Sequence, residues 1–191
     1  MVLIGGAPVE MPWVQKAGTV LWSYYGGQEA GAALADVLTG EVNPSGHLPT
    51  TFAKRLKGSP AFALAGGYGA KESDYQEGIF VGYRWFDARK IEPLFPFGHG
   101  LSYTTFKIAN LKAVKDGSGV KVSVEVRNTG TTAGAEVVQI YVGQPKCSVE
   151  RPVRELKGFA SVDLNPGETK TLEMPLDQRA FAYWSDLENN W

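Results

Sequence analysis

An alternation of apolar and polar side chains near residue 120 constrains the fold more than any other feature of this sequence. Valines occupy every second position and polar or charged residues fill the positions between them: Val120, Val122, Val124 and Val126 among Lys121, Ser123, Glu125 and Arg127. A period of two places successive side chains on opposite faces of a β-strand. The segment therefore predicts a strand with one face buried and the other in solvent.

Further strands are predicted at regular intervals after this one. Residues 135–142, 155–164 and 169–176 are rich in β-branched residues or alternate in the same way, and Gly-containing turn sequences at 116–119, 128–130 and 165–167 separate the strands. Short strands at such spacing are typical of a β-sandwich of the immunoglobulin or fibronectin type III kind. We therefore expect residues 106–191 to be an all-β sandwich of this kind. The antibody-type Cys–Trp–Cys pattern is absent, since Cys147 is the only cysteine.

The first third of the chain has a different pattern. Residues 2–4 and 18–25 predict buried strands that end at paired glycines, and residues 48–52 predict a third strand. Between them, apolar residues recur with the spacing of one helix face: Ala30, Ala33, Leu34, Val37 and Leu38. Gly40 suits the position just after that helix. Strands alternating with a helix predict α/β structure, here one part of an open sheet over residues 1–68.

The segment 69–105 lies between these two zones and shows little periodicity. It contains many glycines, prolines and aromatic residues. A flexible tether would be rich in Gly and Ser and would not carry so many aromatic rings. We therefore predict an ordered, irregular linker, in which Arg84 stacks on an aromatic ring or pairs with Glu77.

Charge and composition exclude several functional classes. Nineteen basic and twenty acidic residues give a net charge of −1, so no electrostatic feature predicts a nucleic-acid partner or an anionic membrane partner. The apolar runs are all shorter than the roughly 18 residues of a membrane span. With two histidines and one cysteine, neither a dedicated zinc site nor a disulfide within the chain is expected. We therefore expect no metal and no cofactor.

Several motifs then coincide in order along the chain. They are GAPVE at 6–10, GGQEAG at 26–31, NPSGHLP at 43–49, EGIFVGYR at 77–84, FPFGHGLSYT at 95–104, RP at 151–152 and ELKGF at 155–159. Together they resemble the C-terminal third of glycoside hydrolase family 3, in its β-glucosidase branch. The resemblance covers nearly the whole chain, and the two longest strings are the most specific.

The resemblance implies a division of the chain into parts of a larger enzyme. That family combines an N-terminal (β/α)8-type barrel, an α/β sandwich and often a fibronectin type III-like domain. Residues 1–68 would be the C-terminal half of the α/β sandwich, 69–105 the linker and 106–191 the fibronectin type III-like domain. A chain that opens on a core strand further suggests truncation. The expected partners are then a carbohydrate substrate and the missing barrel domain.

The resemblance transfers no catalytic residue to this chain. Retaining glycosidases need two carboxyl groups about 5–5.5 Å apart, and the family places its nucleophilic Asp in the barrel and its acid/base Glu upstream of the matched segment. Glu29 and Asp36 are seven residues apart on the predicted helix, a rise of about 10.5 Å, which exceeds that separation. Asp74 and Glu77 lie in the irregular segment and could converge, but nothing in the sequence specifies that they do, and surface positions are the favoured interpretation.

The remaining reactive side chains also have structural explanations. His47 and His99 could each act as a base, although both lie among turn residues and suit packing. Cys147 has no basic neighbour in the sequence that would activate it as a nucleophile. Gly26 and Gly27 precede a helix as in an anion-binding turn, but a tight turn needs the same residues.

Three aromatic residues are the candidates for contact with sugar. Trp22, Tyr24 and Tyr25 lie at the end of the second predicted strand, and open α/β sheets bind ligands at the carboxyl ends of their strands. Packing into the core is the competing interpretation for all three.

Two functional classes follow from these observations. The first is a partial β-glucosidase in which this chain has a structural role and lacks the catalytic carboxylates. The alternative is a stand-alone, non-catalytic binding module, and a variant of the first is assembly with a separate barrel subunit. Residues 1–6 lack the basic start of a signal peptide, so secreted, periplasmic and cytoplasmic locations all stay open.

Overall fold

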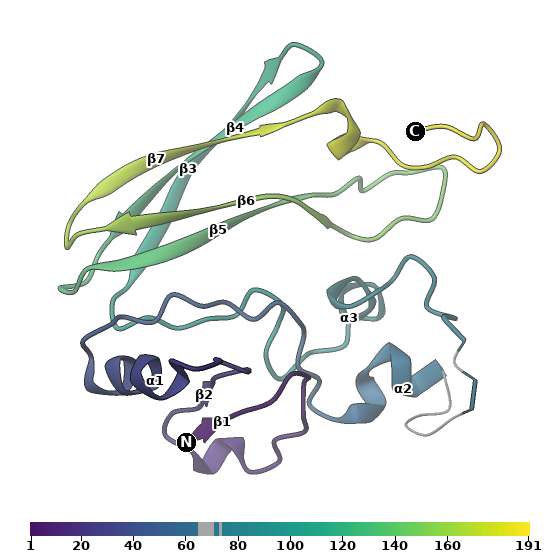
Figure 1. The fold of residues 1–191 in the computed structure, drawn as a ribbon. Coiled ribbons are helices and arrows are strands. Elements are labelled where there is room, and N and C mark those ends of the chain that lie inside the picture. Colours follow the sequence, from purple (N-terminus) through teal and green to yellow (C-terminus); the bar gives the residue numbers. More distant parts are fainter. Residues whose placement is uncertain (65–70, 73) are drawn as a thin grey trace. The chain divides into compact units, whose positions relative to one another are not determined.

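The computed structural model describes residues 1–64, 71, 72 and 74–191, which form two compact units (Figure 1). The first unit comprises Met1–Val42, Gly46–Gly100 and Cys147–Val153. The second comprises Asn43–Ser45, Leu101–Lys146 and Arg154–Trp191. The predicted boundary at residue 68 lies outside the described residues, and the three-part division at 68 and 105 stays a prediction. Among the described residues, no helix is long and apolar enough to cross a membrane.

The first unit contains a short parallel sheet and a helix. Strand β1 (Val2–Leu3) pairs with β2 (Leu21–Trp22). The second strand is much shorter than the predicted 18–25. Its ladder partner among the described residues is two residues long, and Tyr24 takes a positive φ of 47° that ends the extended run. Helix α1 (Ala30–Thr39) has the predicted extent and stops at Gly40, whose φ of 87° is left-handed.

The strand predicted at 48–52 is wrong as a regular strand. This segment makes an isolated bridge between Phe52 and Phe95, with Phe52 N donating to Phe95 O and Leu94 N donating to Phe52 O, both at 2.8 Å. Further along, Leu48 N donates to His99 O at 2.8 Å. Pro49 has no N–H to contribute, so the two segments pair through separate bonds and not through a continuous ladder.

The middle segment contains a helix that the sequence pattern did not predict. Helix α3 (Tyr83–Arg89) buries Trp85 and Phe86. Seven residues are too few to show a helical period, so the aromatic run looked irregular. The structure adds the short helix α2 (Pro60–Leu64) and the 3₁₀ turns η1 (Val14–Lys16) and η2 (Leu56–Gly58). The guanidinium carbon of Arg84 lies 5.9 Å from the centre of the Tyr83 ring, in agreement with the predicted stacking.

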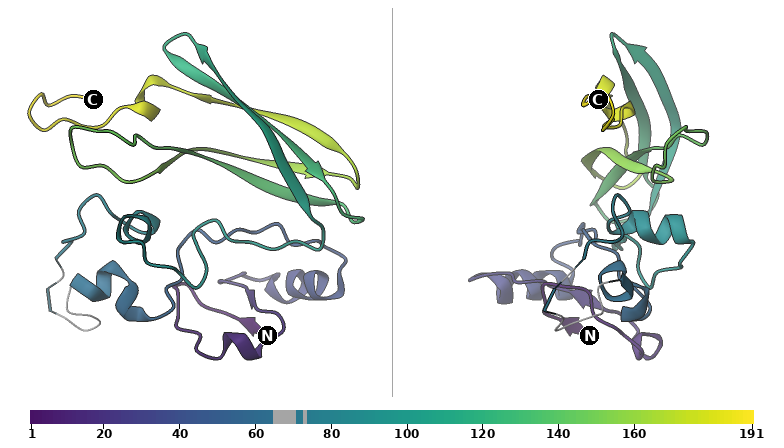
Figure 2. Two further views of the ribbon diagram at one scale, coloured as in Figure 1. Left: turned by 180° about the vertical axis from the view of Figure 1, so that it is seen from behind. Right: turned by 90° about the vertical axis from the view of Figure 1, so that its right-hand side faces the viewer.

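The second unit is a β-sandwich, as predicted. Strands β3 (Phe106–Asp116), β4 (Gly119–Asn128) and β7 (Thr169–Leu176) form one antiparallel sheet, and β5 (Gly134–Val142) and β6 (Glu155–Leu164) form another. Figure 2 shows the two sheets as separate layers within this unit. Strand β3 was not predicted because residues 106–116 do not alternate: a bulge between Ala109 and Lys112 interrupts the register. The 3₁₀ turn η3 (Gln178–Phe181) follows β7.

The core of the sandwich lies between the two sheets. Its fully buried members come from four strands: Val124, Val126, Val138, Val162, Leu164 and Met174. The valines that alternate in the sequence are thus the buried face of β4. Asn128 lies at the end of this strand and is fully buried as well.

Candidate functional site

The end of β2 carries an aromatic cluster in the first unit. The Trp22 ring meets Phe52 edge to face at 5.1 Å between centroids and Tyr24 at 6.0 Å. The cluster continues from Phe52 to Phe95 at 6.3 Å and from Phe95 to the stacked His99 ring at 5.1 Å. Phe52 is only 1% exposed. Trp22 therefore packs into the core of the first unit.

The two tyrosines after Trp22 differ in their surroundings. The Tyr24 hydroxyl is buried and has no hydrogen-bond partner among the described residues, and burial raises the pKa of this phenol. Tyr25 is 77% exposed, and its ring lies against Gly6, where a Cβ would come within 2.8 Å of it. Strained backbone at a residue such as Tyr24 is frequent near functional sites. Of the three candidates, Tyr25 is the one open to a ligand.

Several buried polar atoms near this cluster lack partners among the described residues. They are Trp22 Nε1, the Tyr24 hydroxyl, Thr50 Oγ1 and Thr51 Oγ1. A buried polar group without a hydrogen bond costs about 1–3 kcal/mol. Polar groups that formed hydrogen bonds with these atoms would therefore stabilise this part of the first unit.

The carboxylates singled out in the sequence lie apart from this cluster. Glu29 is the residue before α1 and Asp36 is on the helix, both exposed. Asp74 is exposed and accepts a bond from Gln76 Nε2 at 3.5 Å, and Glu77 is half-buried. None of the interactions seen in the described residues joins two of these carboxylates. Among the described residues, there is also no group of three or more His, Cys, Asp or Glu side chains that could hold a metal ion.

The two histidine motifs meet in the first unit. Leu48, next to His47, donates its N–H to His99 O, and a Cβ on Gly100 would lie 2.4 Å from Gly46 O. Burial, and then the neighbouring charge of His47, lower the pKa of His99. The strings at 43–49 and 95–104, which carry part of the family resemblance, thus pack against each other. The Cys147 thiol is free and half-buried.

Asn43 has a role that its position in a turn sequence did not reveal. Its Nδ2 donates to Ala133 O at 2.8 Å, while its Oδ1 accepts from Ser102 Oγ at 2.9 Å and from Tyr103 N at 2.8 Å. These partners all belong to the second unit, as does Asn43 itself. The only sequence signal was the joint presence of the two motifs that supply Asn43 and Ser102.

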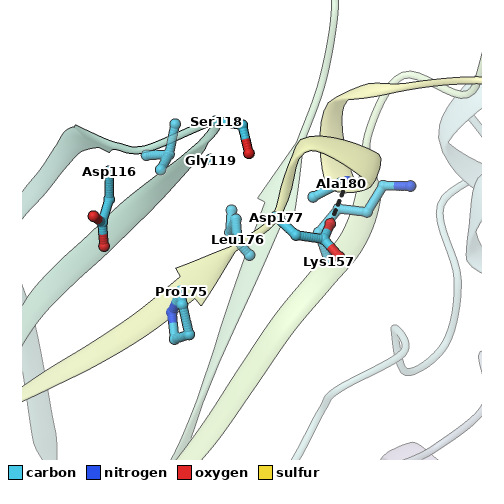
Figure 3. Close-up of a pocket in the computed structure, with 9 residues that line it drawn as sticks. Asp116, Ser118, Gly119, Lys157, Pro175, Leu176, Asp177 and Ala180 are labelled. Atoms are coloured by element: carbon cyan, nitrogen blue, oxygen red, sulfur yellow. Dashed lines mark hydrogen bonds between the residues drawn. The ribbon is translucent and has the colours of Figure 1, made fainter.

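The second unit has an open pocket of about 530 Å³ at the end of β7 (Figure 3). Asp116 at the end of β3 and Ser118 in the β3–β4 turn border it, and Lys157 and Asp177 border it beside Ala180. Asp177 Oδ1 accepts the Ala180 N–H at 3.0 Å and so caps η3. The pocket contains neither a histidine nor a cysteine, and one of its carboxylates is already engaged.

Two family models together match most of the sequence. The glycosyl hydrolase family 3 C-terminal domain matches residues 1–103, and the fibronectin type III-like domain matches residues 136–191. The thermostable β-glucosidase B of Acetivibrio thermocellus is 53% identical over 195 residues, which cover 100% of this chain and 26% of that protein.

Solved structures show the same relation. The structure of DesR, a β-glucosidase from Streptomyces venezuelae in complex with D-glucose, matches with a TM-score of 0.93 and 40% identity over 100% of this chain and 25% of its own. The structure of a family 3 β-glucosidase from Bifidobacterium adolescentis matches with a TM-score of 0.93 and 43% identity. The match covers 100% of this chain and 28% of that one. The chain spans about a quarter of the length of the curated relatives it matches. With more than half of its residues matched by the family 3 model, the chain belongs to glycosyl hydrolase family 3, whose β-glucosidases it resembles in their C-terminal part.

Proposed function

We propose that this chain is a structural, non-catalytic part of a β-glucosidase that hydrolyses terminal β-glucosyl residues. The observation that carries the proposal is the coverage: the whole chain aligns with β-glucosidase B, but with only 26% of that enzyme. The carbohydrate substrate and the barrel domain are the proposed partners. The chemistry would then belong to residues outside these 191.

The chemistry of glycoside hydrolysis supports this division of labour. A retaining enzyme holds a nucleophilic carboxylate and an acid/base carboxyl group about 5–5.5 Å apart. In the described residues, Glu29 just before α1 and Asp36 on α1 are exposed, and Asp74 bonds to a neighbouring glutamine. In the first unit, burial raises the pKa of Tyr24 and lowers that of His99.

The surface of the first unit supports a scaffolding role. Helix α1 is rich in Ala and Leu, yet none of its residues is fully buried and Leu38 is 60% exposed. The β1–β2 pair is a parallel sheet of two residues per strand. Parallel sheets are stable when both faces are covered and several strands contribute. We infer that the rest of the enzyme covers these elements.

Tyr25 is the proposed contribution of this chain to sugar binding. Aromatic faces pack against the apolar faces of sugar rings, and the exposed Tyr25 ring lies just beyond the carboxyl end of β2. Trp22 packs against Tyr24 in the core, and Tyr24 has a positive φ of 47° between Trp22 and Tyr25. In an active enzyme containing this segment, Tyr25→Ala is expected to raise KM several-fold with little change in kcat.

Hydrolysis of a chromogenic aryl β-glucoside by the purified chain tests the proposal. No turnover above buffer is expected, with β-glucosidase B as the positive control. Turnover that disappears in Asp74→Asn or Glu77→Gln would contradict the proposal, because these residues would then form a catalytic pair within the chain.

A further inference from the structure

The pocket at the end of β7 in the second unit has an apolar floor that belongs to the core. Leu176 and Ala180 are only 4% and 8% exposed and form one hydrophobic cluster with Val122. Val120, which packs against the same cluster, and Pro175 also line the pocket. Because the core holds this floor in place, the pocket is formed before a ligand arrives, and binding would cost little reorganisation.

A glycine at the start of β4 brings the two sides of this pocket together. A Cβ on Gly119 would lie 2.3 Å from Leu176 O and 3.2 Å from Asp177 Cα. Glycine is therefore the residue that allows β4 to begin this close to the end of β7. The β3–β4 turn and the turn after β7 consequently border the same cavity, although they are far apart in the sequence (Figure 3).

The polar groups around the pocket have hydrogen-bonding capacity that the protein does not use. Among the described residues, neither the Asp116 carboxylate nor the Ser118 hydroxyl takes part in a hydrogen bond or an ion pair. Asp177 uses Oδ1 to cap η3, which fixes its side chain and leaves Oδ2 as an acceptor. Lys157 Nζ lies 3.5 Å from Glu155 Oε1 and has two further N–H groups. The pocket therefore offers a ligand both acceptors and donors.

The charges around the pocket select the class of ligand. An anion would face the two carboxylates of Asp116 and Asp177, and a cation would lie near the ammonium of Lys157. A wholly apolar molecule would take water away from the carboxylates without replacing its hydrogen bonds. A neutral molecule with several hydroxyls meets all of these constraints, because each hydroxyl can both donate and accept. Its C–H groups would then pack on Leu176 and Pro175.

We propose that this pocket binds a neutral monosaccharide in its ring form, through Asp116, Ser118 and Asp177. Sugar hydroxyls donate to the Asp116 carboxylate and to Asp177 Oδ2, and hydrogen bonds to a carboxylate are about twice as strong as those between neutral groups. The volume of about 530 Å³ is typical of a small-molecule pocket. The inference goes beyond the proposed function, because this site lies in the second unit and requires no hydrolysis.

Titration of the isotope-labelled 191-residue chain with D-glucose, followed by NMR, tests the site. At about 100 mM glucose a site with a millimolar dissociation constant is close to saturation, and the amides of residues 116–120 and 176–180 are expected to shift together. D-glucuronate and D-glucosamine have nearly the same ring but carry a negative and a positive charge, and both should bind more weakly. Tighter binding of either one would overturn the choice of a neutral ligand, and unshifted pocket amides would overturn the site.

Substitutions around the pocket locate the binding. Asp116→Ala should raise the dissociation constant for glucose about tenfold, since it removes a hydrogen bond to a charged group. Ser118→Phe, in an exposed turn, should abolish binding by filling the pocket while the circular dichroism spectrum stays unchanged. The matched control is Asp163→Ala, an exposed carboxylate on β6 about 20 Å along the strand from Lys157, and it should bind glucose normally.

Two results with these variants would contradict the proposal. One is normal glucose binding by Asp116→Ala and Ser118→Phe, and the other is equal weakening in Asp163→Ala. Neither result would alter the expected lack of hydrolysis by the chain, so a failure of this site is distinguishable from a failure of the proposed function.

Discussion

Asn128 shows how one buried polar residue organises an end of the sandwich. Its Oδ1 accepts from Thr104 Oγ1 at 2.7 Å and Gly130 N at 3.0 Å, and its Nδ2 donates to Thr132 O at 2.8 Å and Leu164 O at 3.1 Å. With 0% of its surface exposed, the side chain has every polar atom satisfied by the protein. A fully satisfied buried network of this kind specifies one packing arrangement.

Replacing Asn128 tests the network. Asn128→Ala should lower the free energy of unfolding of the second unit by about 2–4 kcal/mol, because it leaves several buried partners without a hydrogen bond. Asn128→Asp should also destabilise the unit, since a carboxylate oxygen would face the Thr132 and Leu164 carbonyls. Urea unfolding followed by circular dichroism measures both. If both variants unfolded within about 0.5 kcal/mol of the original chain, the network would have no stabilising role.

His99 makes the stability of the first unit depend on pH. Burial and the nearby His47 lower its pKa from the ordinary value of 6.5. The unfolded chain therefore binds a proton more readily than the folded chain, and the free energy of unfolding should fall as pH decreases through 6.5. The loss should level off below the folded-state pKa. NMR titration of the ring protons gives that pKa directly, and a value above 6.5 would contradict this account.

Two glycines of α1 test the local rules at the level of the element. Gly40 ends the helix with a φ of 87°, whereas Gly31 lies inside the helix with open space around the position of a Cβ. Gly40→Ala should destabilise α1 by about 1 kcal/mol, because the left-handed conformation strains an L-residue. Gly31→Ala should stabilise it by about 0.5–1 kcal/mol. Amide exchange of the α1 residues measures both changes in stability. If both substitutions changed the stability of α1 in the same direction, the different roles assigned to Gly31 and Gly40 would be refuted.

The elements that could be predicted from the sequence were those with a clear period. The strands near 120–127, 135–142, 155–164 and 169–176 are confirmed, and so is the helix that starts at Ala30. Strand β3 was missed because the bulge at Asn110 and Leu111 disrupts its alternation, and α3 because it has only two turns. The strand predicted at 48–52 is wrong because pairing between distant segments, and not local pattern, decides whether a ladder forms.

The candidate site was less predictable than the fold. Trp22, Tyr24 and Tyr25 were singled out together, yet Trp22 packs in the core and Tyr25 is exposed to solvent. These surroundings depend on contacts with residues distant in the sequence, Phe52 for Trp22 and Gly6 for Tyr25. The four-way bonding of Asn128 and the position of Asn43 likewise depend on residues that no periodic pattern connects. The assignment of sugar contact to Tyr25 stays a proposal.

At the scale of the whole molecule, the two units pose different stability problems. The second buries two hydrophobic clusters, whereas α1 in the first has no fully buried residue. Limited proteolysis is therefore expected to remove the first unit and leave a resistant fragment that begins near residue 100. Mass spectrometry of the fragments measures this. A resistant fragment from the first unit would contradict the predicted order of stability.

The central claim is that this chain supplies the structural C-terminal part of a β-glucosidase and not its chemistry. A chimera tests it most directly: the segment of A. thermocellus β-glucosidase B that aligns with this chain is replaced by these 191 residues, and hydrolysis of an aryl β-glucoside is measured. The account predicts that the chimera is active, while β-glucosidase B without that segment and the 191-residue chain alone are both inactive. A chimera that folds but does not hydrolyse the glucoside would contradict the claim.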